Sequence, residues 1–177
     1  MLFDWTKKKI EYFIAASRYT GFHEKLSKYI TPYLSKDDDL IDIGCGLGLI
    51  DLEICDQVKS ITAVDENDKV IESLSDIITE RNIDNIFPKR DDFKNLHGGD
   101  WDILLMSFFG TFDDHMKRMV DSIRNRTIII THGSENEPLH SKVHPLVKSV
   151  FISEIEEYFV LRGNVKIRGN VKITGNR

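Results

Sequence analysis

The stretch LIDIGCGLGLID, residues 40–51, decides the fold of this 177-residue chain. It opens as a short apolar run, which indicates a buried strand, and three glycines then follow at every second position. Glycine accepts positive φ and has no Cβ that would collide with a ligand. We therefore expect a loop that holds a ligand against bare main chain, between the carboxyl end of a strand and the start of a helix.

Strand-like and helix-like segments alternate through the middle of the chain. Strands are expected at residues 40–44, 60–65, 85–90, 101–109 and 126–132. Pro88 confines the third of these to a strand end or an edge of the sheet. Helices are expected at residues 47–58, 66–82, 113–125 and 144–163. This alternation predicts an α/β fold with a Rossmann-like, doubly wound, mostly parallel sheet and helices on both faces.

The two ends of the chain differ from this core. Residues 6–34 indicate two helices, broken near Gly21 and ended by Pro32, beside the sheet or over its ligand edge. The tail contains the hexapeptide RGNVKI twice, which indicates a short hairpin or a frayed terminus. We divide the chain, as a single domain overall, into N-terminal helices (1–36), an α/β core (37–161) and a basic tail or hairpin (162–177).

The C-terminal strands of the sheet are expected to be short or missing. Only 14 residues follow the helix expected at 144–163. A sheet shortened in this way exposes an edge that a second protomer could cover, which motivates the hypothesis of a homodimer.

Composition and charge narrow the class of protein. Residues 162–177 carry five basic residues and no acid, so the remainder holds 19 basic and 29 acidic residues, a net charge of −10. The negative charge of residues 1–161 repels the phosphate backbone of nucleic acids, so we expect no nucleic-acid partner. No membrane-spanning run or secretory signal is evident. With only two cysteines, Cys45 and Cys55, the protein is expected to be cytoplasmic.

The glycine spacing separates two classes of cofactor. A dinucleotide-binding site typically has the motif G-x-G-x-x-G, but Leu49 occupies the position of the third glycine in this chain. Asp42, inside the apolar strand, would repel a pyrophosphate and would favour an ammonium group. An NAD-dependent oxidoreductase therefore remains the less favoured alternative.

The motif DIGCGLG resembles the first motif of the class I S-adenosylmethionine-dependent methyltransferases, and the resemblance covers about residues 19–132. It implies S-adenosyl-L-methionine as cofactor and methyl transfer as activity. In that family the loop packs under the cofactor and the strand acid lies near its methionine amine. These roles fall on Asp42, Gly44, Cys45, Gly46 and Gly48.

Two further strand ends fit the same resemblance. Asp65 ends the second strand, where a carboxylate accepts from both ribose hydroxyls, and Glu66 follows it. Asp92 matches the acid that accepts from the adenine amino group, and the main-chain N–H of Phe93 would meet the ring. Asp91 is the rival to Asp92. Asp65 and Asp92 are also residues that commonly cap helices.

Other candidates border the cofactor's methionine end and its methyl group. Met106 and Ser107 end the fourth strand, next to the transferred methyl in the family. The segment RYTGFHEKL, residues 18–26, resembles the one that reaches the methionine end, with Tyr19, Gly21 and His23 as candidates. Helix packing and capping are the simpler interpretation of these three residues.

The acceptor is expected to be a small molecule. The N-P-P-Y type of motif, found where bases and glutamine are methylated, is absent. Phe108 and Phe109 could wall an apolar substrate pocket or fill the core. His132 is the better candidate for a general base, and we expect no metal site from His132, His140 and His144. A non-catalytic S-adenosylmethionine-binding module is the alternative function.

Overall fold

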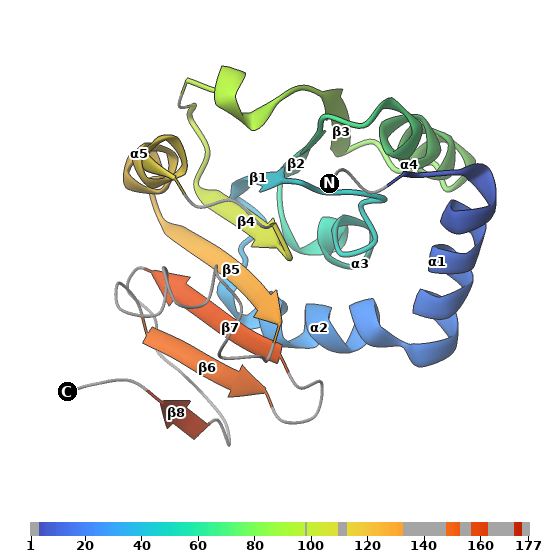
Figure 1. Ribbon diagram of the computed structural model, residues 1–177. Helices are drawn as coiled ribbons and strands as arrows, with labels where there is room; N and C mark the ends of the chain where they lie inside the picture. The colour runs from blue at the N-terminus through green and yellow to red at the C-terminus, as the bar shows by residue number, and fades with distance from the viewer. Residues whose placement is uncertain are drawn as a thin grey trace.

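One eight-stranded sheet runs through the protein (Figure 1), in the order β3-β2-β1-β4-β5-β7-β6-β8. The computed structural model describes residues 4–97, 99–109, 113–132, 148–152, 157–162 and 172–174. The strands are β1 (Asp39–Ile43), β2 (Ser60–Asp65), β3 (Ile86–Arg90), β4 (Ile103–Ser107), β5 (Arg126–His132), β6 (Lys148–Ile152), β7 (Glu157–Arg162) and β8 (Lys172–Thr174).

Strands β1 to β5 form the parallel part of the sheet, as the alternating sequence predicts. Asp42 of β1 lies opposite Ala63 of β2 and Leu105 of β4. The order reverses at β1, so the carboxyl ends of β1 and β4 meet at the switch point where ligands bind in such sheets. Strand β3, which contains Pro88, lies at the edge of the sheet, in agreement with the sequence.

Helices cover both faces of this parallel part. They are α1 (Lys7–Thr20), α2 (Phe22–Ile30), α3 (Asp51–Ile54), α4 (Asp68–Glu80) and α5 (Asp114–Ser122). Gly21, with φ of 61°, ends α1 and starts α2, which confirms the predicted break. The helix expected at 47–58 is shorter: only α3 and a 3-10 turn, Cys55–Gln57, form there. None of the described helices is long and apolar enough to cross a bilayer.

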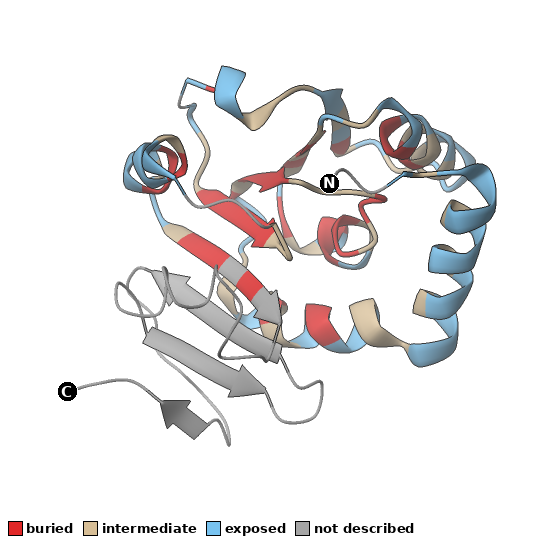
Figure 2. Cartoon of the chain, viewed as in Figure 1, coloured by how far each residue is buried: buried red, intermediate tan, exposed pale blue. Residues whose placement is uncertain are grey.

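Alternate residues of β1 feed two apolar cores. Leu40 packs with residues of α2, α3 and α4, including Leu26, Ile54 and Leu74. Ile41 packs on the other face with residues of α5. Figure 2 shows the result: β1 and β4 are buried, while α1 is exposed along most of its length.

The prediction for the C-terminal region was wrong. Residues 144–163 were expected to form a helix, but β6 and β7 lie there and pair antiparallel with each other. Strand β7 also pairs antiparallel with β5, so the edge of the parallel sheet is covered within the chain. The segment is rich in β-branched and aromatic residues, and β5 offers it an unpaired edge.

The tail joins the same sheet. Strand β8, from the second RGNVKI copy, pairs antiparallel with β6, while the first copy beyond Arg162 lies outside the described residues. The sheet is therefore not shortened, and the exposed edge that motivated the homodimer hypothesis is occupied by the chain's own strands.

Candidate active site at the carboxyl edge of the sheet

The glycine loop lies directly after β1 and is fixed to β2. The main-chain N–H groups of Gly44 and Cys45 both donate to the carbonyl oxygen of Val64, at 2.8 and 3.0 Å. All three loop glycines have positive φ, between 54° and 75°, a region that other residues adopt only under strain. The sequence thus places a rigid turn of bare main chain at the switch point.

The three glycines have different neighbours. A Cβ on Gly44 would lie 2.3 Å from Cδ2 of Phe109, and a Cβ on Gly48 would lie 2.7 Å from the side chain of Leu74. Nothing lies within 4 Å of the position that a Cβ on Gly46 would take. Gly44 and Gly48 therefore allow close packing inside the protein, and Gly46 leaves its main chain open to a ligand.

Asp65, at the end of β2, supports the loop. Its Oδ2 accepts from the Gly46 N–H at 3.0 Å, and its Oδ1 accepts from the Asn67 N–H at 2.9 Å. The N-cap of α4 is Asn67, so Asp65 does not cap that helix itself. A carboxylate has about four acceptor positions, so two remain on Asp65 for ribose hydroxyls.

Two aspartates are buried beneath the loop. Asp42 is 2% exposed and Asp51, the first residue of α3, is fully buried. Burial is the main cause that raises the pKa of both carboxyls, for Asp51 to about 7, and the proximity of Asp51 raises that of Asp42 further. No described donor satisfies Oδ1 of Asp42 or either carboxylate oxygen of Asp51. Such a site suits a positively charged group.

Cys45, between the first two glycines, faces the same acids. Burial, followed by the charges of Asp51, Asp42 and Asp65, raises the pKa of its thiol well above the usual value. The thiol therefore stays protonated near neutral pH and is a poor nucleophile.

The end of β3 carries the second group of candidates. Oδ1 of Asp92 accepts from the Lys94 N–H at 2.9 Å and caps a 3-10 turn, Phe93–Asn95. Its rival Asp91 is held by Lys89 at 2.8 Å and by Asn95, and these bonds lower its pKa. The ring of Phe93 packs edge-on against that of Phe109, with centroids 5.2 Å apart.

The remaining candidates lie in several environments. Met106 is fully buried in the core on the α5 side, and Ser107 is half-buried at the end of β4. Tyr19, in α1, is 94% exposed, so its ring is not packed on the loop in this conformation. Glu66 is exposed, and its carbonyl oxygen accepts from Arg90 at 3.4 Å.

The histidine candidates are only partly described. His23 is half-buried, and its Nδ1 lies 2.6 Å from Oγ of Ser17. Burial lowers the His23 pKa to about 4, so its ring is neutral at physiological pH. His132 ends β5, while His140 and His144 lie outside the described residues.

Sequence reasoning missed Asp51, whereas Phe109 packs against the core on the α5 side, which was one of its two interpretations. Asp51 lies inside the quoted stretch, but it was given no role there, because residues 47–58 were expected only to form a helix. The signal available was an acid three residues after the last glycine, at the start of a helix packed under the loop.

A parallel sheet with this glycine loop at its switch point is the fold of the class I S-adenosylmethionine-dependent methyltransferases. A protein of Methanococcus maripaludis assigned to this class has a TM-score of 0.69 and 15% identity, covering 95% of this chain and 99% of that one. A methyltransferase-like protein of Streptococcus mutans, in complex with S-adenosylhomocysteine, has a TM-score of 0.58 and 15% identity, covering 78% and 94%.

An rRNA methylase of Streptococcus thermophilus has a TM-score of 0.59 and 14% identity, covering 77% of this chain and 92% of that one. At such identities the likeness is one of fold. The family follows from the sequence itself: residues 5–136 match the family described as tellurite resistance protein TehB. The chain belongs to this family and is a class I methyltransferase with S-adenosyl-L-methionine as its cofactor. This decides against the NAD-dependent alternative.

Proposed function

We propose that the carboxyl edge of β1 to β4 transfers a methyl group from S-adenosylmethionine to a small-molecule acceptor. The open main chain at Gly46, flanked by Asp65 and by the buried Asp42, carries this proposal. The open position at Gly46 leaves its main chain accessible to the cofactor, and the buried acids suit the cofactor's positive charge.

In this proposal, residues at three strand ends each bind a different part of the cofactor. Asp65 accepts from the ribose hydroxyls with the two acceptor positions that Gly46 and Asn67 leave free. Asp92, rather than Asp91, accepts from the adenine amino group, because Lys89 and Asn95 already hold Asp91. The main chain at Gly44, Cys45 and Gly46 supports the cofactor from below.

The bound cofactor supplies an activated methyl group. The acceptor's lone pair forms a bond to the methyl carbon while the carbon–sulfur bond breaks. The electron pair of the broken bond stays on sulfur, which gives S-adenosylhomocysteine. The protein's contribution is to hold the acceptor in line, and proximity alone can supply about 7 kcal/mol or more. A base is needed only when the acceptor must lose a proton.

Charge supports a small acceptor over a nucleic acid. Residues 1–161 carry a net charge of −10, and the loop is surrounded by Asp42, Asp51 and Asp65. The rRNA methylase of the same fold makes RNA the alternative to test. The family description makes tellurite the first small acceptor to test. The proposal includes a cytoplasmic location. Such a location fits the free thiols of Cys45 and Cys55 and a cofactor that is made in the cytoplasm.

The test is transfer of labelled methyl from S-adenosylmethionine. The purified protein is incubated with a metabolite extract, with tellurite, and with rRNA, and label is followed in each fraction. We expect label in the metabolite or tellurite fraction and none in rRNA. Label in rRNA alone would replace the small acceptor by a nucleic acid, and tight cofactor binding without any transfer would favour the non-catalytic module.

A further inference from the structure

The deepest part of the site contains a pair of acids that no cation neutralises. This aspartate pair, Asp42 and Asp51, comes from two elements: Asp42 shares the face of β1 that Leu40 presents to α3, and Asp51 starts α3. Oδ2 of Asp51 lies 3.3 Å from the position that a Cβ on Gly48 would take. The carboxyl group of Asp51 is therefore directly beneath the last glycine of the loop.

The two carboxyls can satisfy each other only if they share a proton. Each carboxyl acts on the pKa of the other beneath the loop, yet two carboxylates have no donor between them. Each is buried, and each lacks another described partner at one oxygen or more. Two like charges so close in a buried site cannot both ionise readily, as in other carboxylate pairs that hold one proton.

Every described group that acts on the pair adds to this effect. Asp65 on β2 raises the pKa of Asp42, and the neighbouring thiols of Cys45 and Cys55 bring no positive charge. No lysine, arginine or histidine of the described ranges is among the groups that shift the pair. The described part of the chain therefore supplies no counter-ion at this point, and a cationic ligand would supply one.

We propose that the aspartate pair shares one proton in the free protein and releases it to solvent when the cofactor's amino group binds. This inference rests on the proposed function, because it assumes that the cofactor lies over the glycine loop. Asp51 acts as a positioning residue: it holds Asp42 beneath the loop while the site is empty, and the ammonium group replaces the shared proton afterwards. Binding is then linked to pH, and affinity rises as the pair loses its proton.

The experiment counts protons released on binding. Calorimetric titrations with S-adenosylhomocysteine are run at pH 6.5 in phosphate and in imidazole, whose ionisation enthalpies differ. The slope of the observed enthalpy against ionisation enthalpy gives the proton count. We expect a substantial fraction of one proton for S-adenosylhomocysteine, and almost none for 5′-methylthioadenosine, which lacks the amino-acid end.

Two variants test whether the released proton comes from the aspartate pair. Asp51→Asn keeps the shape but removes the shared proton, so proton release with S-adenosylhomocysteine should nearly vanish. Asp56→Asn, at an exposed position just after α3, should release protons as the unaltered protein does. A merely structural role of Asp51 would leave the proton count unchanged.

The outcomes distinguish this inference from the function on which it rests. Buffer-independent binding of S-adenosylhomocysteine, or equal release in Asp51→Asn, would overturn the proton-sharing pair and leave cofactor binding intact. Equal release with 5′-methylthioadenosine would overturn the assignment to the amino group. No binding of either ligand would overturn the proposed function itself.

Discussion

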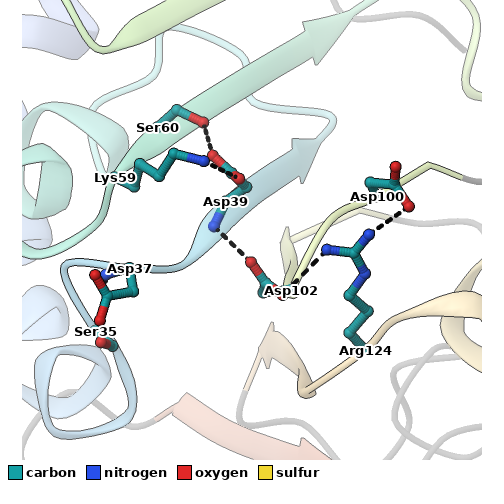
Figure 3. Close-up of polar contacts among 8 residues, drawn as sticks. All are labelled: Ser35, Asp37, Asp39, Lys59, Ser60, Asp100, Asp102 and Arg124. Atoms are coloured by element: carbon teal, nitrogen blue, oxygen red, sulfur yellow. Dashed lines mark hydrogen bonds and ion pairs between the residues drawn. The ribbon is translucent and has the colours of Figure 1, made fainter.

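The carboxylates at the two edges of the parallel sheet differ in their hydrogen-bond and ion-pair partners. At the amino edge (Figure 3), Asp39 accepts from Lys59 at 2.7 Å and from Ser60 at 2.5 Å, and these bonds lower its pKa. Asp102 accepts from the Asp39 N–H at 3.0 Å and faces Arg124. At the carboxyl edge, Asp42 on the same strand is buried, and no cation among the described residues acts on it.

This difference indicates what each edge is for. The amino edge satisfies its acids with partners from the chain itself, as expected where a structure only has to be stable. The carboxyl edge keeps buried acids that lack partners, at a cost in stability that a protein tolerates where a ligand completes the site. The same residue type, three positions apart on β1, is thus paired within the chain at one end and, in the proposed function, faces the cofactor at the other.

The largest change in stability is expected from a substitution in the glycine loop at the carboxyl edge. Gly44→Ala should lower the free energy of unfolding by about 2 to 5 kcal/mol, from left-handed strain and from overpacking against Phe109. Gly46→Ala has similar strain but no neighbour within 4 Å, and should cost about 1–2 kcal/mol. Urea denaturation measures both, and equal losses would contradict the close contact with Phe109.

The second prediction concerns pH. The raised pKa of Asp51 means that the folded protein holds a proton, between pH 3.8 and about 7, that the unfolded chain has lost. The contribution of Asp51 to stability is thus fully present below this window and declines as pH rises through it. Compared with Asp51→Asn, the unaltered protein should lose about 2 to 4 kcal/mol of unfolding free energy between pH 4 and pH 7.

His23 makes the comparison with the variant necessary. Its lowered pKa contributes a change of opposite sign, because its stabilising contribution is lost as pH falls toward about 4. His23 is common to both proteins, so the difference between their profiles reports Asp51 together with its effect on the pKa of Asp42. Parallel profiles by urea denaturation at each pH would show that Asp51 is ionised in the folded state throughout.

The third prediction tests the cofactor role of Asp65. Asp65→Ala should weaken binding of S-adenosylhomocysteine at least about tenfold, because charge-assisted bonds to two hydroxyls are lost. Asp68→Ala, at an exposed acid three residues further along, is the matched control and should bind normally. Calorimetry measures both affinities, and an unchanged value for Asp65→Ala would remove the ribose assignment.

The smallest effect is expected at the amino edge. The side chain of Lys59 is 62% exposed and its ion pair is screened by solvent, so Lys59→Ala should lower the unfolding free energy only slightly. Cofactor affinity should not change. A tenfold loss of affinity by calorimetry would show that the two edges are not independent and would break the comparison.

The sequence predicted those features that local chemistry determines. Gly21 separates two helices and Asp65 ends β2, as their residue types and spacing indicated, whereas Asp92 lies two residues beyond the end of β3 and caps a 3-10 turn. It failed where a partner far along the chain decides the outcome. Within the helix expected at 144–163, strand β7 pairs with the edge of β5, and the pairing partner cannot be read from the segment itself.

The same limit applies within the site. Asp42 was expected to face a ligand amine, but its partner Asp51 became apparent only once α3 was placed beneath the loop. The helix at 47–58 was expected to be long and regular, and an acid on such a helix would be assigned to solvent. The short α3 instead turns its first residue inward, where it is fully buried.

Helix α1 gives the glycine loop a cover that is only loosely attached. Ile10 and Ile14 pack against Leu47, Val70 and Ile71, yet no residue of α1 is itself buried. Little apolar area holds this helix, so its amides should exchange with solvent through small local openings, while those of β1 and β4 wait for global unfolding. Local opening at α1 would therefore expose Leu47 of the glycine loop while the buried strands of the sheet stay closed.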